Sequence, residues 1–314
     1  MGRRRRSSPI RRKSGCDASS PPISAASPGR RASPEGKQDM SATATLPEAL
    51  AAQLDALRAD YDRDGAVRVR GAFGPEWLAM LDRGIERNME EPGPMGKRYT
   101  PEGKPGMFFA DYCNWQRIPE YREFLFHSPA AEIVGRLMGS RKVNLFHEHV
   151  LVKEPGTLEP TPWHHDQPYW TVDGFQVCSL WMALEPVPRE AGVEYVAGSH
   201  RWGRWFRPKR FADQKDHPTD EFETMPDMEQ VKRENRLLGW DLAPGDCVVF
   251  QGLTLHGAPG NHLPTRRRAV SSRWTGDDAT YVLRNGFMSP PPLPGAPEPG
   301  GPMDSPVFPV VRRA

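Results

Sequence analysis

Beyond Gly139 the chain is divided into short apolar stretches by turns that contain glycine or proline, and this pattern most limits the folds that it can adopt. No long helical pattern separates one stretch from the next, which argues against a parallel sheet with crossover helices. The 34 Pro and 29 Gly residues fit a loop-rich protein dominated by β-structure. The expected strands are residues 143–153, 176–184, 193–196, 247–255 and 269–275.

The part of the chain before Gly139 carries helical patterns instead. Apolar residues spaced by three and four predict an amphipathic helix over residues 46–61, and a short strand is expected at 66–70. Gly74-Pro75 is expected to open a second helix, and a third is expected from Ser128-Pro129 to Gly139. Helices first and antiparallel strands afterwards predict a mainly β (α+β) fold, with a helical support packed on a double-sheet jelly roll.

Basic residues are concentrated at the N-terminus. Residues 1–39 contain ten Lys/Arg and three Asp/Glu, against 32 and 37 in the remainder. We expect residues 1–43 to be a disordered basic tail and residues 44–314 to form one domain, with a β core at about 143–285. The tail could bind anions weakly, but nothing else in the sequence indicates a nucleic-acid partner, so none is expected.

The chain contains no candidate membrane span, because no apolar run approaches the roughly 20 residues that a spanning helix needs. The basic start is not followed by the apolar stretch of a signal peptide. The four cysteines form no C-x-x-C pair and are interpreted as reduced thiols. We therefore expect a soluble cytoplasmic protein without a membrane partner.

A histidine and an aspartate in the segment PWHHDQP (162–168) are candidate metal ligands. His164 and Asp166 are two residues apart, so in an extended strand their side chains would leave the same face, and His165 would point away. His256 lies far downstream, at the end of an apolar stretch. Two imidazoles and one carboxylate form the facial triad of non-haem Fe(II) oxygenases, which leaves positions open for a co-substrate and O₂.

An arginine cluster follows His256 after a glycine- and proline-containing turn. A hairpin of this length would bring Arg266, Arg267 and Arg268 beside the strand that ends at His256. The co-substrate 2-oxoglutarate has a carboxylate remote from the metal, and the planar fork of arginine suits such a group. Side chains alternate along a strand, so only some of the three can face inward, and the residues alone do not say which.

The segments around these residues resemble the phytanoyl-CoA dioxygenase family, bacterial-type members in particular. The likeness runs from about residue 63 to 309, and the ordered set of motifs is far more specific than an H-x-D pair. It implies a double-stranded β-helix fold (jelly roll, cupin-like) and a dioxygenase domain in residues 44–314. The matching motifs are LVKEPG (151–156), TPWHHDQPYW (161–170), SLWMAL (179–184), VAGSH (196–200) and HGAPGN (256–261).

The resemblance also implies a metal and a co-substrate. His164 and Asp166 match the proximal iron ligands of the family, and His256 matches the distal one. The implied cofactors are Fe(II), 2-oxoglutarate and O₂, with ascorbate as a candidate reductant, and the implied partner is a small-molecule substrate. Related halogenases lack the carboxylate ligand, so the presence of Asp166 favours hydroxylation, with release of succinate and CO₂.

The co-substrate pocket is implied in the same way. Arg267, eleven residues after His256, matches the arginine that binds the distal carboxylate of 2-oxoglutarate. Trp181 and His149 match positions that line this pocket. His149 stands where a Met is often found, and Ala258 replaces a Ser that is frequent in the family.

Several alternatives stay open at this stage. Trp181 could be a core residue of a buried strand instead. The basic and aromatic residues 201–210 either receive an anionic substrate or form a solvated loop. Phe108, Phe109 and Trp115 either cover the iron as a lid or pack the helical layer. A protein of another class, a cupin-type metal-binding or isomerase protein without 2-oxoglutarate turnover, would have no need of Arg267.

Overall fold

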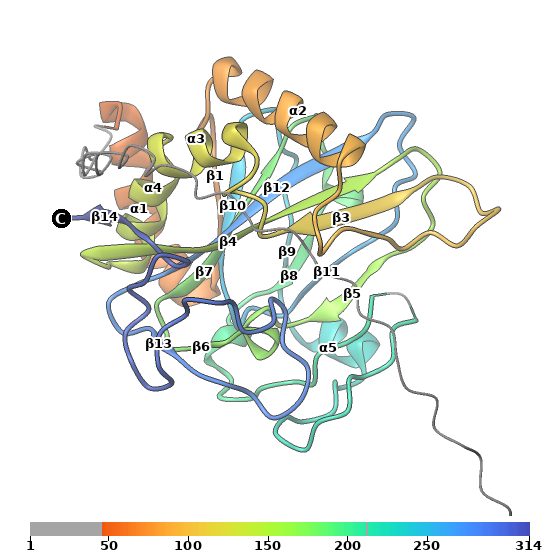
Figure 1. The fold of residues 1–314 in the computed structure, drawn as a ribbon. Coiled ribbons are helices and arrows are strands. Elements are labelled where there is room, and N and C mark those ends of the chain that lie inside the picture. Colours follow the sequence, from red (N-terminus) through yellow and green to blue (C-terminus); the bar gives the residue numbers. More distant parts are fainter. Residues whose placement is uncertain (1–45, 212) are drawn as a thin grey trace, which may run out of the picture. The chain divides into compact units, whose positions relative to one another are not determined.

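Two antiparallel sheets dominate the computed structural model, which describes residues 46–211 and 213–314 (Figure 1). The tail expected at residues 1–43 and Cys16 lie outside these residues. Every pairing between named strands of the described residues is antiparallel. The sheets have the strand arrangement of a jelly roll, which confirms the expected double-stranded β-helix fold.

The large sheet has the order β1-β10-β7-β12-β4-β3-β2, and β14 pairs with β4 beyond this path. Its four central strands come from distant parts of the chain, so contacts between residues far apart in sequence hold the sheet together. The strands are β1 (Ala66–Val69), β2 (Lys97–Arg98), β3 (Phe108–Tyr112), β4 (Lys142–Lys153), β7 (Val177–Ala183), β10 (Cys247–Gln251), β12 (Arg267–Thr275) and β14 (Val310–Arg313).

The small sheet has the order β5-β11-β8-β9, and a two-stranded pair β13-β6 lies beside the two sheets. These strands are short, since they span the narrower wall of the jelly roll. Their bounds are β5 (Thr161–His164), β6 (Val172–Asp173), β8 (Glu194–Val196), β9 (Leu237–Leu238), β11 (His256–Ala258) and β13 (Thr280–Tyr281).

Helices α1 to α4 pack together with the large sheet (Figure 1). The principal apolar core lies between them and contains Leu54, Leu81 and Phe124 from the helices and Val249 from β10, all at most 1% exposed. The helices are α1 (Glu48–Asp64), α2 (Pro75–Glu90), α3 (Pro119–His127), α4 (Ala130–Met138) and α5 (Met228–Glu234), with 3₁₀ turns at Gln167–Tyr169, Arg189–Ala191 and Ser199–Arg201.

The alternation of side chains along β12 separates this core from the interior of the jelly roll. Val270 and Trp274 point into the helical core. Arg267, Ser271 and Arg273 point the other way and line a cavity between the sheets. Burial of an apolar side chain such as Val270 contributes roughly 1.5–3 kcal/mol, so the apolar face of β12 fixes the orientation of its polar face.

The boundaries of α2 and α4 agree with the sequence signals, α1 lies two to three residues further along the chain than expected, α3 was not expected, and one expected strand is too long. Helix α2 begins at Pro75, and α4 ends before Gly139, whose φ is 66°. The strand expected over residues 247–255 ends at Gln251. The Gln251 side chain accepts a hydrogen bond from Leu253 N at 2.6 Å, and this turn carries the chain from the large sheet into the small one.

Two further expectations concern cysteines and membranes. Cys113, Cys178 and Cys247 are free thiols, in agreement with the expectation that the cysteines are reduced. In the part of the chain that the structure describes, no helix combines the length and apolar character needed to cross a bilayer.

A tight turn at Gly245 sets the start of β10. Asp246 N donates to Ala243 O at 3.0 Å, and Gly245, with φ +87°, holds the left-handed position that follows Pro244. Phe73 N donates to Gly245 O at 3.1 Å, which ties this turn to the segment between β1 and α2. A Cβ at residue 245 would lie 2.2 Å from Phe73 O, so the close approach requires glycine.

We expect Gly245→Ala to lower the free energy of unfolding by more than about 2 kcal/mol, because left-handed strain of roughly 1–2 kcal/mol is joined by a backbone clash. Gly203→Ala is the matched control, since Gly203 has φ +67° but no atom within 4 Å of its Cβ position. Urea denaturation compares the two variants. Equal losses would show that the contact with Phe73 does not constrain the turn.

Candidate metal centre

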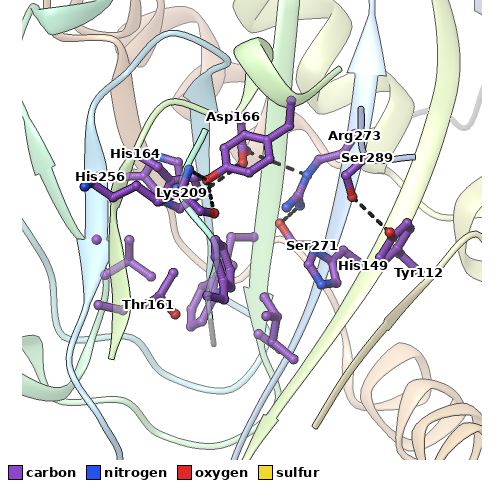
Figure 2. A pocket seen from close by; sticks show the side chains of 18 of the residues that line it. Tyr112, His149, Thr161, His164, Asp166, Lys209, His256, Ser271, Arg273 and Ser289 are labelled. Carbon is purple, nitrogen blue, oxygen red and sulfur yellow. Dashed lines mark hydrogen bonds and ion pairs between the residues drawn. The ribbon is translucent and has the colours of Figure 1, made fainter. Parts of the chain in front are cut away.

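The cavity between the two sheets has a volume of about 440 Å³ and holds the candidate metal ligands. Its lining comes from β2, β3, β4, β7, β10 and β12 of the large sheet, from β5, β8 and β11 of the small sheet, and from loop residues that include 209–211, 217, 287 and 289. This size suits a small organic molecule, and enclosure between two sheets removes such a molecule from bulk water. Figure 2 shows the side chains that converge there.

Three buried side chains meet at one end of this cavity. His164 and His256 are directly paired across β5 and β11, and their ring centroids are 4.2 Å apart. Asp166 Oδ1 lies 3.5 Å from His164 Nε2 and 4.0 Å from His256 Nε2. One ligand atom of each residue lies within 4.8 Å of the other two, so a single ion could contact all three.

The sequence predicted these three residues, but the local structure that brings them together differs from the expectation. Strand β5 ends at His164, and Asp166 has helical φ and ψ at the start of the 3₁₀ turn Gln167–Tyr169. His256 begins β11 and does not end the preceding strand. The turn is fixed by Gln167 N, which donates to Gly252 O at 2.9 Å.

Backbone carbonyls orient both imidazole rings. His164 Nδ1 lies 2.7 Å from Pro162 O, and His256 Nδ1 lies 2.9 Å from Thr254 O. A carbonyl oxygen can only accept, so Nδ1 carries the proton and Nε2 of each neutral ring keeps its lone pair. Burial and the neighbouring His164 lower the pKa of His256 to about 3, which keeps this ring neutral.

The carboxylate of Asp166 is held through its other oxygen. Ser179 Oγ donates to Asp166 Oδ2 at 2.7 Å, and Arg273 Nε lies 3.7 Å from the same atom. Burial by itself raises the pKa of Asp166, but the charge of Arg273 and the contact with His164 outweigh burial and hold this pKa well below its usual range. Oδ1 therefore belongs to an ionised carboxylate and faces the two Nε2 atoms.

Two imidazole nitrogens and one carboxylate oxygen are a donor set that suits Fe(II) and other first-row divalent metals. The tautomers, the ionised carboxylate and the short separations all fit such an ion. His165, between the two ligand candidates, packs against Phe206 with a centroid distance of 4.9 Å, and it points away from the cavity as expected.

Arg267 is the member of the arginine cluster that lines the cavity. The expected hairpin is wrong, because β11 belongs to the small sheet and β12 to the large one. Arg267 donates to Ala191 O and to Pro259 O, and it forms no ion pair within the described chain. Burial lowers its pKa to about 10, so it remains charged at neutral pH.

The two neighbours of Arg267 point to the opposite face of β12. Arg266 pairs with Glu86 and Glu154. Arg268 pairs with Asp82, Glu86 and Glu185. The alternation of side chains along the strand thus directs Arg267 to the interior. This answers the question, left open by the sequence, of which of the three arginines faces inward.

Trp181 and His149, the other candidate pocket residues, also line the cavity. Trp181 is 7% exposed and belongs at the same time to an apolar cluster with Tyr195 and Phe250, so both interpretations of this residue hold. His149 Nε2 is buried without a hydrogen-bond partner in the described chain. Burial and the charge of Arg273 lower the pKa of His149 to about 3.

Of the remaining candidate segments, one reaches the cavity at its end and the others pack outside it. Phe108, Phe109 and Trp115 are buried and do not line the cavity, which favours packing over a lid. Within residues 201–210, Arg201 and Arg204 form exposed ion pairs with Asp62 and Glu223. Only the end of this segment, Lys209 and Arg210, reaches the cavity.

The sequence reasoning missed Ser179 and Arg273. Ser179 lies in the motif SLWMAL, but its contact with Asp166 depends on the large sheet, which contains β7, facing the small sheet, which contains β5. Arg273 could have been found, because it is six residues after Arg267 on one strand and therefore shares its face.

Comparisons with known proteins identify the family and the fold. A family model described as phytanoyl-CoA dioxygenase (PhyH) matches residues 61–269. The chain is 25% identical over 174 residues to a probable phytanoyl-CoA dioxygenase of Caenorhabditis elegans, covering 51% of this chain and 52% of that protein. It is 24% identical over 235 residues to the multifunctional dioxygenase prhA of Penicillium brasilianum, covering 70% and 71%. The match to the nematode protein thus spans about half of its length.

A similar solved structure is the epimerase SnoN from nogalamycin biosynthesis, in complex with Fe³⁺, alpha ketoglutarate and nogalamycin RO. It superposes with a TM-score of 0.67 at 24% identity, over 83% of this chain and 100% of the other. At this identity the likeness establishes the fold.

We expect Ser179→Ala to weaken divalent-metal binding by about 10- to 100-fold, because residues that orient a metal ligand typically have effects of this size. Ser272→Ala is the matched control, since Ser272 is equally buried but accepts from Trp274 Nε1 at 2.8 Å on the core side. Titration of the metal against a chelator measures both affinities. Equal affinities in the two variants would separate Ser179 from metal binding.

Proposed function

The chain belongs to the phytanoyl-CoA dioxygenase family, and we propose that it is an Fe(II)- and 2-oxoglutarate-dependent dioxygenase that hydroxylates an unactivated C–H bond of a small molecule. The observation that carries the proposal is the convergence of His164, Asp166 and His256 inside a cavity that also holds Arg267, which has no acidic partner among the described residues.

His164, Asp166 and His256 would hold the iron through Nε2, Oδ1 and Nε2. Iron with bound 2-oxoglutarate supplies the oxidation of the C–H bond, with release of succinate and CO₂. The protein provides an ionised carboxylate, two imidazoles whose rings are fixed by backbone carbonyls, and walls that exclude water. No general base is needed for this chemistry.

Arg267 would bind the distal carboxylate of 2-oxoglutarate. Its guanidinium is buried, charged and without an acidic partner in the described chain. A charge in this environment is costly unless an anion accompanies it, and the fork of arginine matches a carboxylate. Trp181, His149 and Ala258 line the same space and would shape the pocket of the co-substrate.

In the competing cupin-type function without 2-oxoglutarate turnover, Arg267 would have no co-substrate carboxylate to bind. The SnoN neighbour is described as an epimerase, so a related site can act without adding oxygen to its product. Mass analysis of the product distinguishes hydroxylation, which adds one oxygen atom, from a reaction such as epimerisation, which adds none. The cytoplasmic location, the absence of a nucleic-acid partner and the boundary at residue 44 stay predictions.

We expect Asp166→Ala to abolish Fe(II) binding and succinate formation, because the variant removes the charged ligand from the three. Asp173→Ala serves as control, since Asp173 is paired with Arg284 and is not part of the cavity. Anaerobic Fe(II) titration and succinate release in a metabolite screen provide the measurements. An Asp166 variant that binds Fe(II) normally would count against the triad.

We expect Arg267→Ala to weaken 2-oxoglutarate binding by about 10- to 100-fold, the loss that one charged hydrogen-bonding group typically causes. Arg266→Ala, which removes a neighbouring charge on the outer face, should leave this affinity nearly unchanged. Anaerobic titration of the Fe(II) protein with 2-oxoglutarate measures both. Unchanged dependence on 2-oxoglutarate in the Arg267 variant would favour the cupin-type alternative.

A further inference from the structure

A second arginine, Arg273, lines the same cavity, and the proposed function gives its guanidinium no ligand to bind. It lies on the inward face of β12, six residues beyond Arg267. Six residues of a strand span roughly 20 Å, so the two backbone positions lie at opposite ends of the cavity wall. Figure 2 shows Arg273 between Asp166 and Ser271.

The guanidinium of Arg273 is buried but largely unpaired. Nη1 donates to Ser271 Oγ, and Nε has no hydrogen-bond partner in the described chain. Its distance of 3.7 Å from Asp166 Oδ2 is too long for a hydrogen bond, and that oxygen already accepts from Ser179. Arginine has five N–H donors, and burial of unpaired donors is costly, so this arrangement indicates a ligand that accepts from them.

Two further polar atoms beside Arg273 lack partners. His147 and His149 lie opposite Arg273 and Ser271 on β4. His147 Nδ1 and His149 Nε2 are buried without a hydrogen bond in the described chain. The ring of Trp170 flanks the guanidinium at 5.6 Å. We call Arg273, Ser271 and His147 the inner polar pocket, and His149 borders both this pocket and the space proposed for the co-substrate.

The charge of the cavity favours an anion. Seven of the described lining residues are Lys or Arg, and Asp166 is the single acid among them. Two of the seven, Lys209 and Arg210, are paired with Asp216 and Asp213 outside the lining. With the proposed function, the charges of Fe(II), Asp166, the two carboxylates of 2-oxoglutarate and Arg267 sum to zero, so an anionic group of the substrate would balance Arg273.

The rest of the cavity is aromatic. Tyr169 and Phe211 stand close to the metal centre, with ring centroids 5.7 Å and 5.3 Å from that of His164. Phe287 stacks on His217 at 3.7 Å, and both rings line the cavity. Such walls suit an apolar molecular body attached to the anionic group.

We propose that the primary substrate is an organic carboxylate with an apolar body, and that Arg273 binds its carboxylate in the inner polar pocket. This inference rests on the proposed function and names its substrate class. Because Arg273 lies 3.7 Å from the carboxylate that would hold the metal, the oxidised carbon lies near the anionic end of the substrate.

The test is a binding experiment that needs no turnover. The protein is loaded anaerobically with Fe(II) and 2-oxoglutarate and exposed to aliphatic, alicyclic and aromatic carboxylic acids, each paired with its methyl ester. Tryptophan fluorescence, to which Trp170 beside Arg273 contributes, and the thermal unfolding temperature report binding. We expect at least one acid to bind about tenfold more tightly than its ester, a difference of about 1.4 kcal/mol.

Variants then assign the preference to Arg273. Arg273→Gln should remove the preference for acid over ester while 2-oxoglutarate still binds, and Arg273→Lys should restore part of it. Arg284→Gln is the matched control, because Arg284 is also buried and charged but lies outside the cavity. It should keep the full preference.

Three results would overturn the inference. The first is a wild-type protein that binds no acid in the panel better than its ester, an outcome that does not depend on the folding of any variant. The second is an Arg273→Gln variant that keeps the preference. The third is loss of 2-oxoglutarate binding in a folded Arg273→Gln variant, which would assign this arginine to the co-substrate.

If the dioxygenase proposal is wrong, a different measurement shows it. Chelation of Fe(II) by 2-oxoglutarate produces a visible absorption band, and its absence in the wild-type protein would reject the dioxygenase proposal. The preference for acids over esters can still be measured in the metal-free protein, so the two ideas fail separately.

Discussion

The pairing of β5 with β11 is the contact on which the candidate site depends. It places His164 directly opposite His256, although the two residues come from distant parts of the chain. Asp166 lies at the start of a turn in which Gln167 N donates to Gly252 O. The segment that leads to His256 therefore also positions the carboxylate of Asp166. The metal centre is thus a product of the jelly-roll topology and not of one local motif.

Strand β12 connects this centre to the stability of the protein. Its apolar residues Val270 and Trp274 are anchored in the core beneath the helices, and its polar residues therefore face the cavity. A shift of one residue in register would exchange these two faces, and the cost of burying Arg267 and Arg273 in the apolar helical core excludes it. The packing of the helical layer in this way determines which arginines can meet a ligand.

The sequence predicted the fold class and the three metal-ligand candidates because their signals are local or belong to ordered motifs. It failed where the outcome depends on which strands become neighbours. The helical backbone at Asp166, the separation of β11 from β12, and the contact of Ser179 with Asp166 all depend on the two sheets facing each other. Arg273 carried a readable signal, its spacing from Arg267, but a lone buried arginine stands out only when its partners are known.

The hydrogen bonds from the two imidazoles to Pro162 O and Thr254 O have a consequence for how the protein acquires its ion. Each ring is braced by a carbonyl only two residues earlier in its own chain segment, so the rings are set before any metal arrives. The raw affinities of such a donor set for first-row divalent ions follow their intrinsic order. The identity of the resident ion then depends on the geometry that the fixed rings impose and on the supply of metal in the cell.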